Sequence, residues 1–162
     1  MHRYYPGWYF GHDKLGRPVW YERTGRLQVQ DLLRCVSHDL LLQAYVVDAE
    51  TKRTPLMVEG SRKSGGKYVE STCTIVDLEG INSSLTGKVV RDYLGALTKL
   101  NSTCYPESMG KMFLINAPAI FTASWYIVKA MLDERTVSKV CTNMRDDYRK
   151  LLTTQCHHHH TN

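Results

Sequence analysis

Two short apolar runs, residues 73–78 and 112–117, flank a longer amphipathic segment in the middle of the chain. Short, nearly continuous apolar runs are typical of strands buried on both faces, as in a parallel sheet covered by helices. Between them, from Ser84 to Leu100, apolar residues recur at helical spacing. This segment is long enough for a crossover helix, so residues 68–118 predict a βαβ unit.

The first half of the chain predicts a strand, a helix and a loop before this unit. Residues 4–10 are aromatic and irregular, 13–18 have the composition of a polar turn, and 19–23 predict a strand. Ser37 suits the N-cap of a helix that runs to about Thr51. Residues 60–67 predict a flexible basic loop that leads into a strand over 69–78.

The last third continues the alternation. Residues 121–132 predict a second amphipathic helix, 136–140 a short strand or its approach, and 145–152 a last helix with a charged face. The order of strand and helix, repeated along the chain, predicts an α/β layered fold with a mostly parallel sheet.

Composition narrows the class of protein only slightly. The 162 residues suit one domain, and 43% hydrophobic and 23% charged residues are ordinary for a globular protein. The net charge of +5 favours an anionic partner without selecting membrane over nucleic acid, and no basic block is interleaved with aromatics as in a nucleic-acid module. No apolar run approaches the ~20 residues of a membrane span. Five cysteines without a C-x-x-C spacing indicate reduced thiols in a cytosolic protein.

Catalytic and cofactor motifs are absent from the sequence. The segment 60–67 resembles a phosphate-binding loop but has one residue too many before Gly66-Lys67, and a strand follows it. There is no G-x-S-x-G elbow, and His12 and His38 lack a partner at metal-ligand spacing. We therefore expect no enzyme activity, no cofactor and no metal. The tail at 156–162, with its four histidines, is either a metal site or a shortened tag or disordered terminus, and we exclude it from the domain.

Two features allow both a structural and a functional interpretation. Thr72 and Thr74 are two residues apart on a strand and share a face, so they either pack as ordinary strand threonines or face a cavity that holds a polar ligand. The helix over 121–132 is either a core helix or the cover of an apolar cavity that also meets a bilayer, where Trp and Tyr favour the interface.

Five motifs, taken in order, resemble the CRAL-TRIO family, the lipid-binding domain of the yeast-type phosphatidylinositol/phosphatidylcholine transfer proteins. They are D-K-x-G-R-P-V at 13–19, E-S-T-C-T-I-V-D-L-x-G at 70–80, Y-P-E-x-M-G-K at 105–111, I-N-A-P at 115–118 and L-D-x-x-T-V-S-K at 132–139. The resemblance implies a mostly parallel sheet floor whose covering helices enclose a lipid cavity. It implies a domain over 1–155 that lacks the family's N-terminal helical bundle and closing segment, followed by the tail at 156–162.

The resemblance also assigns candidate headgroup residues. Asp13, Thr136 and Lys139 match positions that bind the inositol phosphate in the family, and their side chains suit phosphate and ring hydroxyls. Four further residues match the choline-type pocket: Tyr9, Trp20, Thr72 and Thr74. Trp20 keeps an aromatic face for a choline cation but lacks the phenol hydroxyl found there in the family.

The remaining implications concern mechanism and partners. Residues 121–132 match the gate helix, with Phe121, Trp125, Tyr126, Val128 and Met131 as its candidate residues. The resemblance implies a non-enzymatic protein that binds and exchanges one phospholipid between its cavity and a membrane, with phosphatidylinositol preferred over phosphatidylcholine. The oligomeric state is left open, with a monomer favoured. The partners of the protein would be the phospholipid and a transient membrane surface, with no nucleic acid, in the cytoplasm at the membrane periphery. The alternative is a membrane-targeting or protein-interaction regulatory module without transfer activity.

Overall fold

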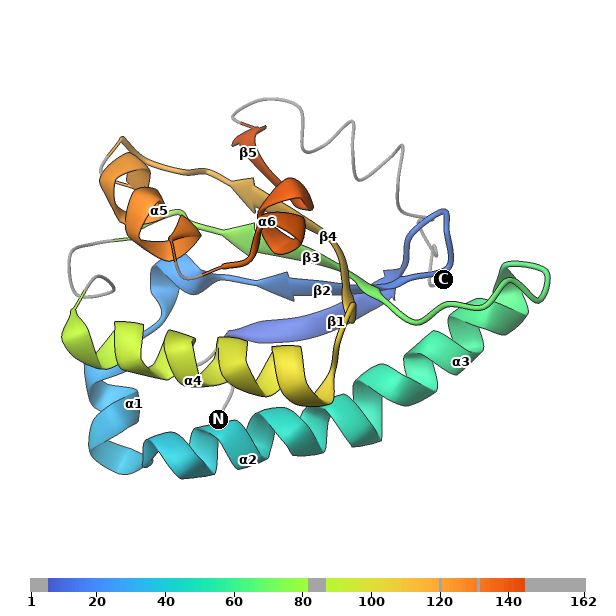
Figure 1. Ribbon diagram of the computed structural model, residues 1–162, viewed down its shortest axis with the longest axis horizontal. Helices are drawn as coiled ribbons and strands as arrows, with labels where there is room; N and C mark the ends of the chain where they lie inside the picture. The colour runs from blue at the N-terminus through green and yellow to red at the C-terminus, as the bar shows by residue number, and fades with distance from the viewer. Residues whose placement is uncertain (1–5, 82–86, 120, 131, 145–162) are drawn as a thin grey trace, which may run out of the picture.

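The computed structural model of the chain, which describes residues 6–81, 87–119, 121–130 and 132–144, is a mixed α/β fold on one sheet (Figure 1). The strands are β1 (Gly7–His12), β2 (Pro18–Glu22), β3 (Thr72–Asp77), β4 (Met109–Ile115) and β5 (Val140–Met144). The helical elements are η1 (Thr24–Arg26), α1 (Val29–Cys35), α2 (His38–Asp48), η2 (Ala49–Arg53), α3 (Thr54–Lys63), α4 (Lys88–Cys104), α5 (Phe121–Lys129) and α6 (Glu134–Ser138).

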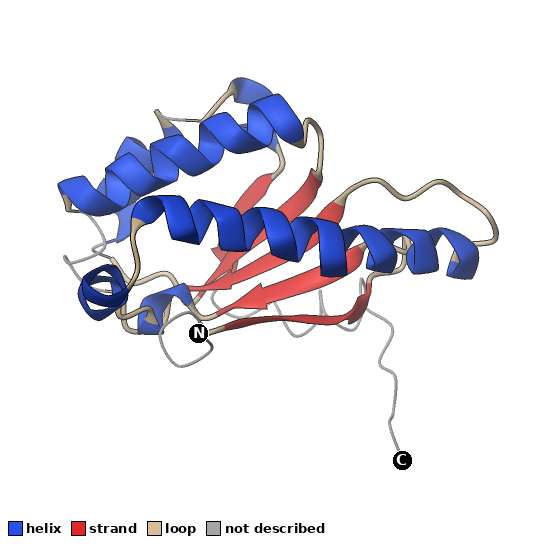
Figure 2. Cartoon of the chain, turned by 90° about the horizontal axis from the view of Figure 1, so that it is seen from below, coloured by secondary structure: helices blue, strands red, loops and turns tan. Residues whose placement is uncertain are grey.

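The sheet is mostly parallel, as predicted. Its strand order is β1-β2-β3-β4-β5, with β1 antiparallel to β2 and every later neighbour parallel. Parallel crossovers are almost always right-handed. Because the parallel strands follow one another in chain order, such crossovers place their helices on the same side, and Figure 2 shows the helices on one side of the sheet.

The two apolar runs form the central strands β3 and β4, with bounds that differ from the predicted ones by a few residues. A cluster of buried apolar side chains crosses the sheet on one face: Val19, Cys73, Ile75, Phe113 and Ile115. These residues alternate along each strand, as the two-residue period of a strand requires. Burial of this cluster therefore fixes the register between β2, β3 and β4.

Residues 7–10 of the aromatic segment expected to be irregular belong to the strand β1, so the expectation is wrong for these residues. Trp8 pairs with Tyr21 and Gly7 with Glu22 in an antiparallel hairpin. In the connecting turn, the Asp13 carboxylate accepts the N–H groups of Leu15 and Arg17, each at 2.9 Å. Pairing across a hairpin depends on the partner strand, and the irregular composition of the segment does not reveal it.

The first long helix continues well beyond its predicted end. Ser37 is its N-cap, as predicted, and accepts the N–H of Leu40 at 3.3 Å. The helix passes through a π-helical segment, η2, into α3, so the predicted loop over 60–67 begins as helix. Gly60 is buried there because the helix backbone lies directly against Gly16. Such close approach requires glycine, and helix propensity alone gives no sign of it.

Two further elements differ from the prediction. The short helix α1 was not predicted. Of the two alternatives for residues 136–140, a short strand or its approach, the structure shows the approach: Asp133 caps α6 at 134–138, and β5 begins at Val140. The predicted helix over 145–152, the tail and the expected start of the helix at Ser84 lie outside the described residues. Within the described part of the chain, no helix combines the length and apolarity needed to cross a bilayer.

Candidate functional site

A row of side chains runs straight across the helix-facing side of the sheet. Tyr9 pairs with Trp20, Trp20 with Thr74, Thr74 with Met112, and Met112 with Val140. Residues opposite one another in a sheet point to the same face. The hydroxyl of Tyr9 donates to Asp48 Oδ2 of α2 at 3.1 Å, so this face is the one that turns toward the helices.

The row brings three of the four choline-pocket candidates together. The rings of Tyr9 and Trp20 meet edge to face with their centroids 4.9 Å apart. Burial, and after it the nearby Asp48 carboxylate, raises the pKa of Tyr9 well above its ordinary value, so its phenol stays a hydrogen-bond donor. Trp20 donates its Nε1–H to Glu22 at 3.1 Å, and Thr74 beside it is half-buried.

Thr72, the fourth candidate of this pocket, is buried at the start of β3. Its hydroxyl lies 3.2 Å from the carbonyl oxygen of Ser108 and donates to it. The same carbonyl accepts the Thr72 N–H at 2.8 Å. Both contacts join the entrance of β3 to the turn before β4, so this hydroxyl already has a partner within the protein.

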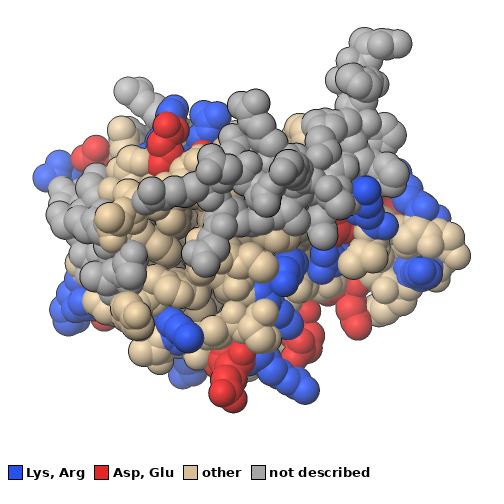
Figure 3. Space-filling model, turned by 90° about the horizontal axis from the view of Figure 1, so that it is seen from above, with Lys and Arg blue, Asp and Glu red and all other residues tan. Residues whose placement is uncertain are grey.

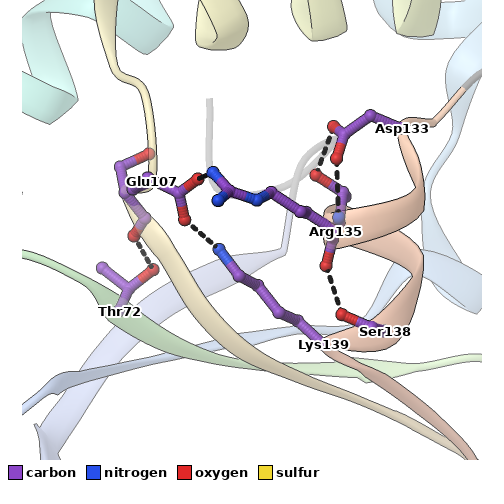
Figure 4. Close-up of polar contacts among 8 residues, drawn as sticks. Thr72, Glu107, Asp133, Arg135, Ser138 and Lys139 are labelled. Carbon is purple, nitrogen blue, oxygen red and sulfur yellow. Dashed lines mark hydrogen bonds and ion pairs between the residues drawn. The ribbon is translucent and has the colours of Figure 1, made fainter.

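Two cations share one carboxylate where β4 and α6 meet. Lys139 Nζ lies 2.7 Å from Glu107 Oε2, and Arg135 Nη1 lies 3.0 Å from Glu107 Oε1 (Figure 4). Lys139 and Arg135 are four residues apart, so both reach Glu107 from the same short helical segment. The Lys139 side chain is 24% exposed, against 83% for Arg135 and 57% for Glu107. The cluster therefore carries two positive charges against one negative charge in a partly covered position.

The hydrogen bond from Lys139, followed by its charge, holds the pKa of Glu107 below its usual value. The backbone of Glu107 has a φ of 58°, in the left-handed region that non-glycine residues seldom adopt. The carboxylate is thus ionised at neutral pH and is aimed by an unusual turn toward the two cations.

Thr136 and Asp13 engage neighbouring groups of their own segments. The N–H of Thr136 donates to Asp133 Oδ1 at 2.8 Å and its hydroxyl donates to Asp133 Oδ2 at 2.7 Å, which caps α6. Asp13 is 2% exposed and pairs with Arg17 Nε at 2.6 Å. In the described part of the chain, no hydrogen bond or ion pair joins Asp13 to Thr136 or Lys139.

An apolar groove of about 880 Å³ lies between α4 and the C-terminal half of α5. Its lining residues are Arg91, Asp92, Gly95, Ala96, Tyr126, Ile127 and Ala130. Tyr126, one of the predicted gate residues, is 71% exposed at this groove. Phe121 and Trp125 stack with their rings 6.0 Å apart, Val128 is half-buried, and Met131 lies outside the described residues.

Sequence reasoning missed Glu107 and Arg135 as members of the site. Glu107 entered only as a letter of the Y-P-E motif, and Arg135 occupies an unspecified position between Asp133 and Thr136. A signal was present for Arg135, since it stands four residues before Lys139 and the two side chains fall on one helical face. No local signal links Glu107 to them, because the contact spans 32 residues.

Comparison with known proteins gives the family. The CRAL/TRIO domain matches residues 2–159, and the chain belongs to this family. The chain is 36% identical over 138 residues to the phosphatidylinositol/phosphatidylcholine transfer protein SFH4 of Arabidopsis thaliana. The aligned region covers 85% of this chain and 22% of the relative. It is 34% identical over 138 residues to the Sec14 cytosolic factor of Schizosaccharomyces pombe, and this alignment covers 85% of this chain and 48% of the relative.

A further relative and a solved structure agree with this membership. The SEC14 cytosolic factor of Eremothecium gossypii is 33% identical over 153 residues, covering 94% of this chain and 49% of the relative. The crystal structure of Sfh5 matches with a TM-score of 0.62 at 16% identity, over 84% of this chain and 46% of that chain, which supports the shared fold. The chain thus spans less than half the length of the curated relatives named here.

Proposed function

We propose that this chain binds one phospholipid, phosphatidylinositol or phosphatidylcholine, and exchanges it with a membrane without catalysing a reaction. The headgroup phosphate would bind beside Lys139, and the acyl chains would be covered by α5. Relatives whose names include phosphatidylinositol/phosphatidylcholine transfer support this class of ligand. The name cytosolic factor, carried by other relatives, supports a cytoplasmic location.

The cluster of Lys139, Arg135 and Glu107 carries the proposal. A phosphate oxygen can replace the Glu107 carboxylate at Lys139 Nζ, because both are anionic acceptors with the same preferred distance. The excess positive charge of the cluster favours that exchange. The hydroxyl of Thr136, one turn before Lys139, would have to leave Asp133 Oδ2 before it could donate to the phosphate. Asp13 stays a predicted inositol-phosphate residue, although Arg17 now occupies its carboxylate.

The aromatic row supports binding of a choline headgroup. Trp20 and Tyr9 present two ring systems at the helix-facing side of the sheet, and a quaternary ammonium group is attracted to such rings. Thr74 stands next to Trp20 in the same row and can bond a phosphate oxygen. Thr72 would have to leave the Ser108 carbonyl, or share its hydroxyl, before it could take part.

The groove between α4 and α5 supports a route for acyl chains. Its volume of about 880 Å³ lies within the ~300–1,000 Å³ typical of ligand sites. Tyr126 and Ile127 expose apolar surface at its rim, where α5 would contact a bilayer interface. On the face in Figure 3, acidic and basic side chains of the described residues are interspersed and form no continuous basic patch.

Native mass spectrometry of the purified 162-residue chain, after incubation with vesicles of phosphatidylcholine and phosphatidylinositol, tests this proposal. We expect one phospholipid per chain, and transfer of that lipid to acceptor vesicles. Uptake of no lipid from these vesicles would overturn the proposal. Association with the vesicles without uptake would instead identify a membrane-targeting or interaction module.

A further inference from the structure

A polar network lies at the carboxyl ends of β2, β3 and β4. Its centre is Asp77, the last residue of β3, which is 7% exposed. Asp77 Oδ2 accepts the hydroxyl of Tyr21 at 2.8 Å, and Asp77 Oδ1 accepts the Asn116 side-chain amide at 2.9 Å. The N–H of Glu79 also donates to Oδ1, at 3.0 Å. Three donors thus converge on one buried carboxylate.

Asn116 has an unusual backbone conformation at this network. Its φ is 53°, and among the described non-glycine residues only Glu107 shares a positive φ. Asn adopts this left-handed region more readily than most residues, but the conformation still needs support from its surroundings. The bond to Asp77 supplies that support, since it holds the Asn116 side chain against the end of the neighbouring strand.

The position of α5 follows from this conformation. Asn116 comes directly after β4, and the chain turns there into Ala117 and Pro118. The N–H of Phe121, the first residue of α5, donates to the Pro118 carbonyl at 2.9 Å. Because the helix begins on the turn that Asn116 opens, a rotation at Asn116 would swing α5 relative to the sheet.

We infer that the hydrogen bond between Asp77 and Asn116 anchors the start of α5 at the carboxyl end of β4 and sets how readily this helix opens. Asp77 and Asn116 are positioning residues, because they act through α5. None of the contacts described above joins them to the groove residues or to the Lys139 cluster. The consequence for lipid exchange rests on the proposed function, whereas the anchoring of the helix does not.

Substitution of Asn116 by glycine separates the side-chain bond from the backbone. Glycine accepts a positive φ without strain but cannot donate to Asp77. Loss of a hydrogen bond to a charged group corresponds to roughly tenfold or more in an opening equilibrium. Hydrogen exchange of the 162-residue chain should therefore show α5 amides exchanging about tenfold faster in Asn116→Gly, while α2 amides stay within about twofold.

Tyr21→Phe is the matched control, because it removes a donor from the same carboxylate and leaves the Asn116 bond in place. Its α5 amides should exchange within about twofold of the wild-type rate. Asp77→Asn keeps the shape of the network, and its weaker neutral acceptor should speed exchange in α5 about threefold. Unchanged α5 exchange in both Asn116→Gly and Asp77→Asn, or equal loosening by Tyr21→Phe, would overturn the inference.

Transfer of phosphatidylinositol between vesicles separates this inference from the proposed function. Faster transfer by Asn116→Gly with an unchanged lipid preference would support the inference that the bond between Asp77 and Asn116 limits the opening of α5. If the wild-type chain transfers no lipid, the proposed function fails, and hydrogen exchange alone decides whether the bond anchors α5. If the wild-type chain transfers lipid and α5 exchange is unchanged in the variants, the anchor fails while the proposed function stands.

Discussion

Lys139 Nζ lies 2.7 Å from Glu107 Oε2, and this contact joins α6 to the turn before β4 across 32 residues of sequence. Lysine is well suited to phosphate as a point charge, and its three donors exceed what one carboxylate oxygen uses. The pair therefore holds the ammonium group in place until a phosphate oxygen replaces the carboxylate, and the remaining donors of Lys139 can bind the same phosphate. Figure 4 shows Lys139 reaching toward Glu107 from below, with Arg135 on the other carboxylate oxygen.

Replacement of Lys139 by alanine should selectively weaken the uptake of phosphatidylinositol. The substitution removes the least exposed cation of the cluster and with it a charge-assisted bond to phosphate. We expect binding to fall about tenfold or more, as native mass spectrometry or vesicle transfer can measure. Lys99→Ala, at an exposed position on α4, is the matched control and should retain uptake. Equal uptake by Lys139→Ala and the wild-type chain would contradict the assignment.

Acid should release the contact between Glu107 and Lys139. The hydrogen bond from Lys139 keeps the pKa of Glu107 below its ordinary 4.5 in the folded chain. A lowered carboxyl pKa means that the contact is present above the ordinary value and is lost as the pH falls through the lower, folded value. Carboxyl NMR should place the Glu107 midpoint below 4.5, and Lys139→Ala should move it upward. A midpoint at or above the ordinary value would show that Lys139 does not hold the carboxylate.

The central sheet was predictable because its signal is local. The apolar runs of β3 and β4 are short and continuous, and burial on both faces leaves few other interpretations. The N-cap at Ser37 also depends on neighbouring residues only. β1 was missed because its pairing with β2 is a tertiary property, and a mixed aromatic segment can be strand or coil.

The candidate site depended mostly on the family resemblance. Motif order indicated Lys139 and Thr136, but it could not show that Asp133 already binds the Thr136 hydroxyl. Nor could it show the two positive φ values at Glu107 and Asn116, which flank β4 at its two ends. Backbone conformations of this kind depend on contacts between distant segments. Neither the hydrophobic period nor the composition of a segment predicts such contacts.

Gly60→Ala should destabilise the chain although alanine favours a helix. A Cβ at this position would overlap the carbonyl oxygen of Gly16, which is backbone and cannot turn away. Helix propensity alone would stabilise the variant by ~1 kcal/mol. Overpacking costs roughly 1–3 kcal/mol, and the severity of this overlap places the cost at the upper end of that range. Urea unfolding should show a net loss for Gly60→Ala and almost no change for Glu59→Ala on the same helix. A gain in stability would show that α3 can shift away from the β1–β2 turn.

Arg53 should be a principal contact between the first long helix and α4. Its side chain is 7% exposed, its Nη1 donates to the Tyr45 hydroxyl at 2.8 Å, and its guanidinium lies 4.6 Å from the Tyr105 ring centroid. The Tyr45 hydroxyl in turn donates to Asn101 of α4. A desolvated cation–π contact together with a hydrogen bond from a charged group is worth about 2–4 kcal/mol.

Arg53→Ala should therefore lower the free energy of unfolding by about 2–4 kcal/mol in urea titrations. Arg53→Lys keeps the charge but loses the planar group that lies over both tyrosine rings, so we expect an intermediate loss. Arg53→Met retains much of the length without charge and should resemble Arg53→Ala if the polar contacts dominate. A change below ~0.5 kcal/mol in Arg53→Ala, the scale of ordinary surface substitutions, would mean that α2 and α4 are held together by their apolar contacts instead.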